Sequence, residues 1–338
     1  MKAVVIGVGR MGRRHAHALR KIGCSIDGVY DISPESRKLA ADEHKLEAGQ
    51  LFGDLEVLFA QCRPDVVVIA TNADTHCELT CLAAARGAKF ILVEKPMAVS
   101  LAECDQMIEA CRLAGAQLAV NHQMRFMPAY TVPKTLFQDP AFAGMRSMTV
   151  VGGNFGFAMN GSHYFEAFRF LTDEVPVEVS AWFSPEIVPN PRGAQYQDRA
   201  GCIRAVTGSG KRLYMDVSAD QGHGFGSTYA CRNGVISVDE LAGELVSSER
   251  EPQYLELPTT RYGMPCISKR ASVSPPDLIE TTVAVLNALV TGQNSVTGED
   301  GRQVVELLVA AHQSADLGGA PVRLDDNGVD RERIFPWA

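Results

Sequence analysis

The sequence predicts an α/β domain built on a doubly wound parallel sheet, followed by an α+β domain with an antiparallel or mixed sheet. Apolar runs alternate with amphipathic helical segments through the first 121 residues, which is the rhythm of a doubly wound sheet. A glycine-rich segment joins the first apolar run to the first helical segment. After about residue 122 the rhythm changes to several strand-like runs bracketed by helical patterns. We therefore expect two domains, at residues 1–121 and 122–338.

Local patterns define the elements of the first domain. Residues 65–70, DVVVIA, form a run that is apolar at every position after Asp65, which is typical of a parallel strand covered on both faces. Thr75 with Glu78, and Ser100 with Glu103, have the spacing of capping boxes. The expected strands cover residues 2–6, 26–31, 65–70, 89–94 and 117–121, and the expected helices cover residues 10–22, 34–43, 75–86 and 100–114.

The second domain is expected to hold several strands between helices. Gly-Ser-Gly at 208–210 lies between two strand-like runs, which predicts a hairpin. The segment 184–198 contains three prolines and is predicted to be a flexible loop. The expected helices are 128–137, 162–171, 276–290 and 298–314, and the expected strands are 145–151, 177–183, 201–207, 211–218, 235–238 and 254–257.

Composition narrows the class of protein and its partners. The 338 residues are 46% hydrophobic and 21% charged, which suits a globular protein with a sizeable core. A net charge of −8 disfavours nucleic acid and anionic membrane surfaces as partners. No apolar run approaches the roughly 18–20 residues of a membrane span. Nine scattered cysteines without a CxxC pair are expected to be free thiols in a reducing compartment, so we expect a cytoplasmic protein.

Residues 7–12, GVGRMG, match the G-x-G-x-x-G pattern of a dinucleotide-binding turn. The context strengthens the match, because the segment directly follows an expected strand and opens an expected helix. The first glycine permits the tight turn, the second lets the backbone approach a pyrophosphate, and the third lets the helix pack on the strand. The residues expected to meet a cofactor here are Gly7, Gly9, Arg10, Met11 and Gly12.

An acidic residue at the end of the second strand indicates which dinucleotide is bound. Asp31 follows Gly12 by 19 residues, where a carboxylate accepts hydrogen bonds from the adenosine ribose and repels a 2′-phosphate. Arg37 lies near enough to pair with such a phosphate. We expect NAD as the cofactor, with NADP as the less favoured alternative.

Four segments carry a family resemblance: GVGRMGRRHA at 7–16, ATNADTHCELTCLAAARGAKFILVEKPMA at 70–98, NHQMRF at 121–126 and GSHYFEAFRFL at 161–171. In these segments the chain resembles the glucose–fructose oxidoreductase, inositol dehydrogenase and MocA (Gfo/Idh/MocA) family. The resemblance implies a Rossmann domain followed by an α+β domain on a large open, mostly antiparallel sheet. It also implies NAD(P)-dependent hydride transfer at a hydroxyl or carbonyl carbon of a sugar, cyclitol, amino sugar or nucleotide-linked sugar. It further implies chemistry without a metal, and a homodimer or homotetramer.

Glu94-Lys95-Pro96 follows an expected strand of the parallel sheet, and ligands bind at the carboxyl ends of such strands. By resemblance Lys95 is the catalytic residue. Alcohol oxidation needs a base for the hydroxyl proton. A lysine has an ordinary pKa near about 10.4, which desolvation and a cationic nicotinamide lower toward the operating pH. The alternative for Lys95 is a structural salt bridge.

By resemblance His163 is a second catalytic residue, with Glu166 as the acid three residues later. Met159 stands where the family has an aspartate four residues before the histidine. Asn160 offers a hydrogen bond but cannot serve as a base, and a structural role is the alternative for His163. The remaining expected cofactor contacts are Thr71, Asn72, His76, Glu94, Lys95 and Asn121, and the expected substrate contacts are Lys95, Arg125, Asn154, Asn160 and His163.

Two of these assignments, and the histidines of the first helix, have a plain structural interpretation. His76 would otherwise cap its helix at the surface, and Arg125 would otherwise form an ion pair between the domains. The histidines of the first helix, His15 and His17, are expected to serve packing and the surface. For the whole chain, the alternative to an oxidoreductase is a non-catalytic NAD-binding sensor or regulator of the same fold, which the missing aspartate favours and the intact Lys95 opposes.

Overall fold

The computed structural model describes the whole chain except residues 154, 223, 258–264, 275–276 and 325–327. The described residues form two compact units. The first comprises residues 1–123, 277–306 and 331–338, and the second comprises residues 124–276 and 307–330. The predicted division differs from this one, because it assigns everything after residue 121 to the second domain.

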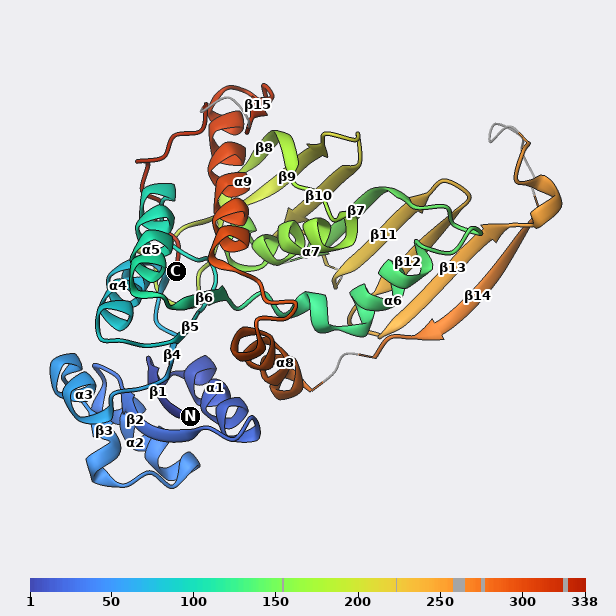
Figure 1. The fold of residues 1–338 in the computed structure, drawn as a ribbon. Coiled ribbons are helices and arrows are strands. Elements are labelled where there is room, and N and C mark those ends of the chain that lie inside the picture. Colours follow the sequence, from blue (N-terminus) through green and yellow to red (C-terminus); the bar gives the residue numbers. More distant parts are fainter. Residues whose placement is uncertain (154, 223, 258–264, 275–276, 325–327) are drawn as a thin grey trace. The chain divides into compact units, whose positions relative to one another are not determined.

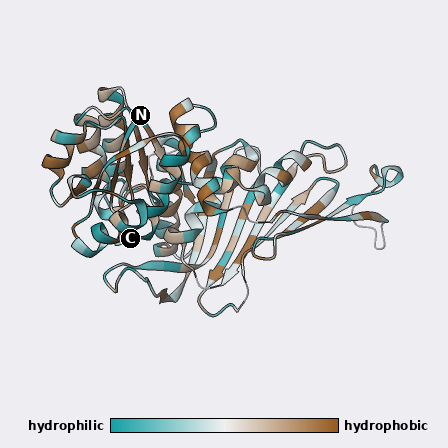
Figure 2. Cartoon of the chain, turned by 90° about the horizontal axis from the view of Figure 1, so that it is seen from below, coloured by the Kyte–Doolittle hydropathy of each residue, from teal (hydrophilic) through white to brown (hydrophobic). Residues whose placement is uncertain are grey.

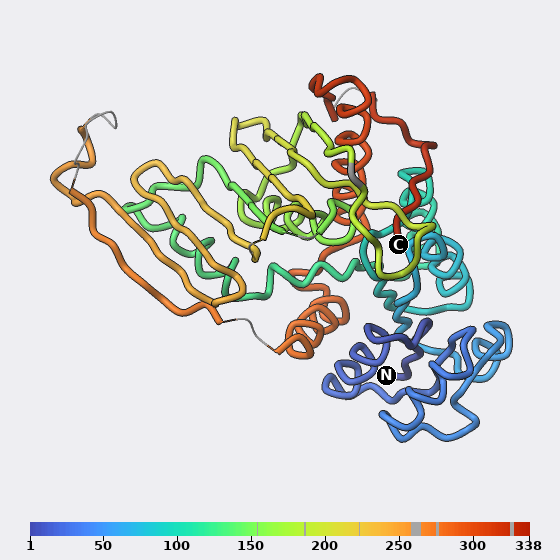
Figure 3. The backbone as a smooth tube through the Cα atoms, turned by 180° about the vertical axis from the view of Figure 1, so that it is seen from behind, coloured from blue at the N-terminus to red at the C-terminus, as the bar shows by residue number. Residues whose placement is uncertain are grey.

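Two later segments join the first unit because their apolar and backbone groups find partners there. Helix α8 (Leu278–Thr291) packs against α1 (Arg10–Lys21). At the C-terminus, the backbone oxygen of Arg331 accepts a hydrogen bond from the N–H of Ala102 at 2.9 Å, and the N–H of Phe335 donates to the backbone oxygen of Val99 at 2.9 Å. Figure 3 shows this terminal segment returning to the elements of the first unit.

The first unit is built on a parallel six-stranded sheet within residues 1–123, all of which are described. The strand order is β3-β2-β1-β4-β5-β6, so the order reverses at β1, as in a doubly wound fold. All four residues of β4 are buried, as its apolar run predicts, and Figure 2 shows these strands coloured as hydrophobic. The strands are β1 (Lys2–Ile6), β2 (Ser25–Tyr30), β3 (Leu51–Phe52), β4 (Val66–Ile69), β5 (Phe90–Val93) and β6 (Gln117–Val120).

The helices of this unit begin where local capping allows. Ser100 accepts a hydrogen bond from the N–H of Glu103 at 3.2 Å and so caps its helix as predicted. The capping box predicted at Thr75 is wrong, because this hydroxyl donates to Thr71 Oγ1 at 2.7 Å and to the backbone oxygen of Asn72 at 2.9 Å. Besides α1 and α8, the helices are α2 (Pro34–His44), α3 (Leu55–Cys62), α4 (His76–Ala85) and α5 (Leu101–Ala114).

The second unit is built on a sheet that has nine strands among the described residues. Its order is β14-β13-β12-β11-β7-β10-β9-β8-β15, and only the β7–β10 pair is parallel. The predicted fold class is therefore confirmed. The strands are β7 (Met145–Gly153), β8 (Pro176–Val188), β9 (Asp198–Thr207), β10 (Arg212–Ser218), β11 (Gly226–Cys231), β12 (Gly234–Asp239), β13 (Glu244–Arg250), β14 (Cys266–Ser272) and β15 (Val322–Arg323).

One face of the second sheet is covered by helices. Strand β10 alternates buried and accessible residues, which is the pattern of a sheet with one packed face. Met148 and Leu213 on the packed face are completely buried. Helices α6 (Pro128–Leu136) and α7 (Ser162–Thr172) lie over this face in the views of Figures 1 and 3, and α9 (Gly298–Asp316) begins in the first unit and ends in the second.

Three sequence predictions for this unit have clear outcomes. The hairpin at 208–210 is confirmed, because β9 and β10 pair antiparallel around it. The strand expected at 254–257 is wrong, since a short 3-10 helix, Pro252–Tyr254, and a turn occupy this segment. The loop expected at 184–198 starts later, because β8 continues to Val188 and pairs there with Asp198. In the described part of the chain no helix is both long and apolar enough to span a bilayer.

Candidate functional site

The glycine turn between β1 and α1 leaves no room for side chains at two of its positions. Gly7 has φ +84°, and a Cβ there would lie 2.8 Å from the carbonyl group of Ala70. A Cβ on Gly12 would fall 1.8 Å from the backbone oxygen of Gly7. A Cβ on Gly9 would meet no atom within 4 Å, so the backbone at Gly9 is open to the approach of another molecule.

The start of α1 has the features of an anion site. Gly9 is the N-cap and supplies no side-chain hydrogen bond, and the first turn contains no acidic residue. Arg10 is exposed in this turn, and the half-buried Met11 accepts a hydrogen bond from Arg14 through its sulfur at 3.4 Å. Because a helix N-terminus presents N–H groups and the positive end of the helix dipole, this turn suits a phosphate.

Asp31, directly after β2, is fixed by the backbone of the glycine turn. Its carboxylate accepts hydrogen bonds from the N–H of Val8 at 2.8 Å and of Ser33 at 2.9 Å. The residue is half-buried. The guanidinium of Arg37 donates to the backbone oxygen of Asp31, so this arginine lies beside the predicted ribose-binding carboxylate.

The loops that follow β4 and β5 are tied together by His76. This side chain is 1% exposed, and its Nδ1 lies 3.0 Å from the backbone oxygen of Pro96 while its Nε2 lies 3.3 Å from that of Thr71. Burial lowers the pKa of His76 and outweighs these contacts. The histidine therefore holds the Thr71–Asn72 loop against the Pro96 segment. The surface cap expected as the alternative at His76 is wrong, because the side chain is buried, and the cofactor contact stays a prediction.

Glu94 and Asn121, at the ends of neighbouring strands, share a buried polar cluster with His15 of α1. Glu94 Oε1 lies 2.7 Å from His15 Nε2 and accepts a hydrogen bond from Asn121 Nδ2 at 2.9 Å. Burial opposes ionisation of Glu94. Hydrogen bonds from His15 and Asn121 and the charge of Lys95 outweigh it and lower the pKa of Glu94 to about 2. The cluster therefore places a permanent negative charge beside Lys95.

His15 has a role at the sheet edge that the sequence does not predict. The side chain is completely buried and faces Glu94, whereas the sequence predicts only packing or surface roles for it. His15 lies three residues after Gly12, on the buried face of α1. This spacing is a sequence signal that could have placed its side chain against the sheet.

Lys95 is the second residue after β5 and is half-buried, and a cis peptide bond joins it to Pro96. Its backbone N–H lies 3.4 Å from Glu94 Oε2. The structure thus gathers Gly7, Gly9, Asp31, Thr71, Asn72, Glu94, Lys95 and Asn121 at the carboxyl edge of one parallel sheet.

In the second unit, an ion cluster involves two residues that the sequence analysis singled out. Glu166 is completely buried and accepts hydrogen bonds from Arg125 Nε at 3.0 Å and from Arg169 NH1 at 2.5 Å. The side chain of Arg125 is only 10% exposed. Arg125 therefore forms an ion pair with Glu166 within the second unit.

His163 lies in the first turn of α7 and is half-buried, as is Asn160 in the π-helical turn Phe157–Gly161 that leads into α7. The carboxylate of Asp198 on β9 accepts hydrogen bonds from the N–H groups of Ala158 and Met159, both at 2.8 Å. Asn154, expected to contact substrate, lies outside the described residues.

Comparison with known proteins identifies the family. A model of an oxidoreductase family with an NAD-binding Rossmann fold matches residues 1–122. D-Apiose dehydrogenase from Paraburkholderia graminis is 34% identical over 141 residues, which cover 41% of this chain and 37% of that protein. Myo-inositol 2-dehydrogenase from Thermotoga maritima is 26% identical over 94% of this chain and 96% of that protein. Residues 1–122 therefore match the Gfo/Idh/MocA family model, and the chain is similar to a named dehydrogenase along most of its length.

A solved structure agrees with the fold of this chain. An oxidoreductase from Agrobacterium radiobacter, in complex with NAD+, L-tartaric acid and magnesium, has a TM-score of 0.79 at 22% identity and covers 96% of this chain and 98% of its own. This likeness supports the fold of both units. The predicted family resemblance is confirmed, and the relatives that match are named as dehydrogenases and reductases.

Asp198 changes how the departure from the family motif is understood. Met159 occupies the position of the expected aspartate. The carboxylate of Asp198, on β9, accepts a hydrogen bond from the backbone N–H of Met159 and so lies beside this position. A Cβ on Gly156 would lie 2.2 Å from the Asp198 carboxyl carbon, so a glycine is needed beside it. No sequence signal links Asp198 to Met159, because 38 residues separate them.

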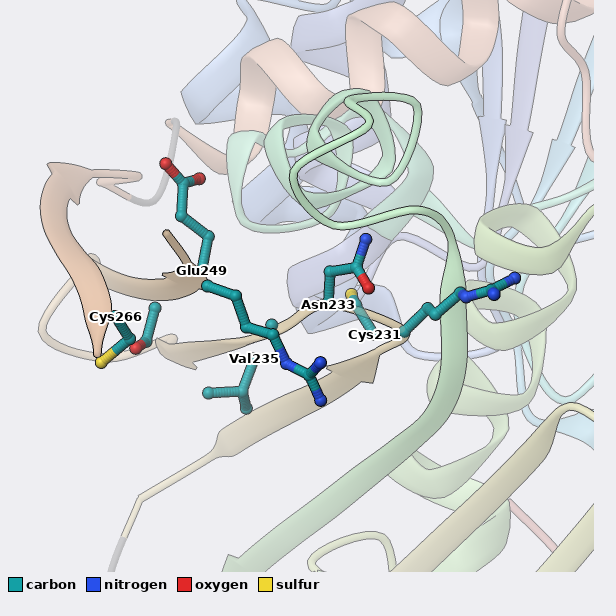
Figure 4. A pocket seen from close by; sticks show the side chains of 9 residues that line it. Cys231, Asn233, Val235, Glu249 and Cys266 are labelled. Atoms are coloured by element: carbon teal, nitrogen blue, oxygen red, sulfur yellow. The ribbon is translucent and has the colours of Figure 1, made fainter. Parts of the chain in front are cut away.

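One surface pocket of the second unit is lined by residues other than those of the candidate site. It has a volume of about 290 Å³ at the edge formed by β11 to β14 (Figure 4). Its lining includes Cys231, Asn233, Glu249 and Cys266 and contains none of the predicted site residues. We therefore do not assign the candidate functional site to that pocket.

Proposed function

We propose that this protein is an NAD-dependent dehydrogenase that moves hydride between the nicotinamide and a CH–OH carbon of a sugar, cyclitol, amino sugar or nucleotide-linked sugar. The observation that carries the proposal is the half-buried Lys95 beside the buried, ionised Glu94 at the edge of the sheet. The names of relatives support the substrate class, since they include D-apiose dehydrogenase, myo-inositol 2-dehydrogenase and 1,5-anhydro-D-fructose reductase.

The residues of the first unit fit a dinucleotide. Gly9 would admit the pyrophosphate to the backbone, the acid-free first turn of α1 would bind its charge, and the Asp31 carboxylate would accept ribose hydroxyls. Thr71, Asn72 and Asn121 would contact the remaining parts of the cofactor. When bound, the nicotinamide supplies the hydride acceptor or donor.

In this proposal Lys95 handles the substrate proton. In the oxidation direction its amine removes the hydroxyl proton, and in the reduction direction its ammonium donates a proton to the carbonyl oxygen. Glu94 keeps its charge at neutral pH because its pKa is about 2, so it stabilises the ammonium form and orients Asn121. We propose that His163 binds the substrate or relays a proton to it, and that Asn160 contributes a hydrogen bond. Arg125 would act as a positioning residue through its ion pair with Glu166.

Lys95→Ala tests the catalytic assignment. We expect near-normal NAD binding and a loss of roughly 10²–10⁴-fold in kcat, measured by absorbance of the reduced cofactor with a panel of sugars, cyclitols and amino sugars. Lys95→Arg keeps the charge but cannot release a proton, so it is also expected to be slow. Lys89→Ala is the matched control, since Lys89 is an exposed lysine at the other end of the same strand.

Full activity of Lys95→Ala would refute the lysine assignment. A wild-type protein that binds NAD but turns over no member of the panel would instead favour the regulator alternative. These two outcomes separate a wrong residue from a wrong function.

The choice of NAD over NADP is tested at Asp31. We expect wild-type kcat/KM to be higher with NAD, because the carboxylate repels a 2′-phosphate. Asp31→Asn keeps an acceptor for the N–H of Val8 but loses the charge, so the NAD preference should fall by about 10-fold or more, the worth of a hydrogen bond to a charged group. A wild-type preference for NADP would contradict the role of Asp31 and leave the fold untouched.

We also propose that the protein forms a homodimer or homotetramer through the uncovered face of the second sheet. Strand register places Val151, Trp182 and Tyr214 on the face opposite the buried Met148 and Leu213. The three side chains are 40%, 54% and 38% exposed, respectively. Exposed apolar side chains gathered on one face favour a protein partner.

A further inference from the structure

Three side chains of the first unit bring metal-ligand atoms together away from the cofactor-binding turn. They are His17 of α1 and Glu43 and His44 of α2, and one ligand atom of each lies within 4.8 Å of the other two. Glu43 Oε1 lies 3.1 Å from His17 Nε2 and 3.8 Å from His44 Nε2. The two imidazole rings meet edge to face, with centroids 4.4 Å apart.

His44 supplies a second, independent observation. Its side chain is completely buried, and neither ring nitrogen forms a hydrogen bond of standard geometry; the nearest polar groups are the backbone of Arg13 and Glu43 Oε1, the latter 3.8 Å from Nε2. A buried polar group without a partner is rare, because it loses its contacts with water and gains nothing in return. His44 faces the cluster, so a bound ion would supply the missing interaction.

We propose that His17, Glu43 and His44 form a binding site for a divalent transition metal ion of the Zn²⁺ type, which links α1 to α2. Two imidazoles and one carboxylate form a typical three-ligand set for Zn²⁺, with water at the open position. Ligand atoms around a tetrahedral Zn²⁺ stand roughly 3.3–3.6 Å apart, and the two distances from Glu43 Oε1 lie on either side of this range. Small side-chain rotations of the exposed His17 would complete the geometry.

The surroundings suit this ion more than others. Arg13 Nε donates to Glu43 Oε2 at 2.7 Å, which orients the carboxylate and leaves Oε1 facing the histidines. Imidazole ligands select zinc and its neighbours over calcium and magnesium, which prefer oxygen ligands.

The test measures metal binding to the intact, metal-stripped protein by titration calorimetry and thermal unfolding. We expect one Zn²⁺ per chain at this site and a higher Tm with Zn²⁺ than with chelator, because a ligand that binds only the folded state stabilises it. Calcium and magnesium should produce neither effect. Cobalt bound in place of zinc should give a visible spectrum without a sulfur-to-metal band, which separates this site from the cysteines.

Two accessible ligands give variants that should fold normally, since the side chains of His17 and Glu43 are 42% and 40% exposed, respectively. His17→Ala and Glu43→Gln should each weaken Zn²⁺ binding by more than about 10-fold and remove the Tm shift. Asp42→Asn, an exposed acid next to the cluster, is the matched control and should bind like wild type. Absence of Zn²⁺ binding to wild type, unchanged binding in both variants, or a thiolate spectrum would overturn the proposal. None of these readouts depends on turnover.

Discussion

At the scale of single residues, the buried carboxylate of Glu94 links two strands and a helix. Burial raises the pKa of Glu94, but hydrogen bonds from His15 and Asn121 and the charge of Lys95 outweigh it. The pKa is therefore about 2, against an ordinary value of 4.5. Between these two values the unfolded chain binds a proton that the folded chain does not. Glu94 therefore stabilises the fold above about pH 4.5, and this contribution disappears as the pH falls through about 2.

Glu94→Gln tests this linkage. At neutral pH we expect the free energy of unfolding to fall by roughly 1.5–3 kcal/mol, which is the contribution of one hydrogen bond to a charged group. The gap to wild type should narrow as the pH falls below about 4.5. Urea unfolding from about pH 3 to pH 7 measures both.

The control for this experiment is Glu56→Gln, because Glu56 is a 65% exposed acid paired with Arg86 at the surface. Its stability should change by less than about 1 kcal/mol. A Glu94→Gln gap that stays constant across the pH range would show that the carboxylate contributes through packing and not through its charge.

At the scale of elements, Asp198 of β9 caps the start of the helical segment that carries His163. Its two oxygens accept the N–H groups of Ala158 and Met159, so an anion lies at the positive end of that segment. This contact orders the backbone before α7. We infer that it positions His163 without touching the substrate.

Asp198→Ala should leave two buried N–H groups without acceptors, at a cost of about 1–3 kcal/mol each, and lower kcat with little change in KM for NAD. Asp198→Asn retains one oxygen acceptor and should recover part of the rate. A merely structural role would lower stability in both variants but leave kcat of the folded fraction unchanged. Asp220→Asn, an exposed acid just after β10, is the control and should match wild type.

The parts that the sequence predicts correctly have strong local patterns. The apolar strand β4 and the capped helix α5 follow from their own residues, and so does the glycine turn. The two-residue strand β3 is too short to show a period, and β14 is exposed along its whole length, so it has no apolar face to detect. The contacts of His15 with Glu94 and of Asp198 with Met159 join distant segments, and no local pattern encodes them.

At the scale of the whole molecule, the second sheet has one packed and one open face. Alternation along β10 buries Leu213 and Met215 under helices, and it exposes Tyr214 between them. Val151 and Trp182 lie on the same open face as Tyr214. A large sheet uses its backbone hydrogen bonds internally, so an open face with apolar side chains can pair only through side-chain packing. A second copy of the same face satisfies this requirement with two-fold symmetry.

Tyr214→Lys and Val151→Lys should therefore shift the assembly toward lower mass, measured by size-exclusion chromatography with light scattering. Each variant introduces two like charges across a two-fold interface, where they are desolvated together. Leu113→Lys on α5 is the control: this side chain is 72% exposed on the first unit, and the added lysine near the helix C-terminus is compatible with the helix dipole. Wild-type mass in Tyr214→Lys and Val151→Lys would place any interface elsewhere. A monomeric wild type would refute oligomerisation while leaving the assignments of Lys95 and Asp31 intact.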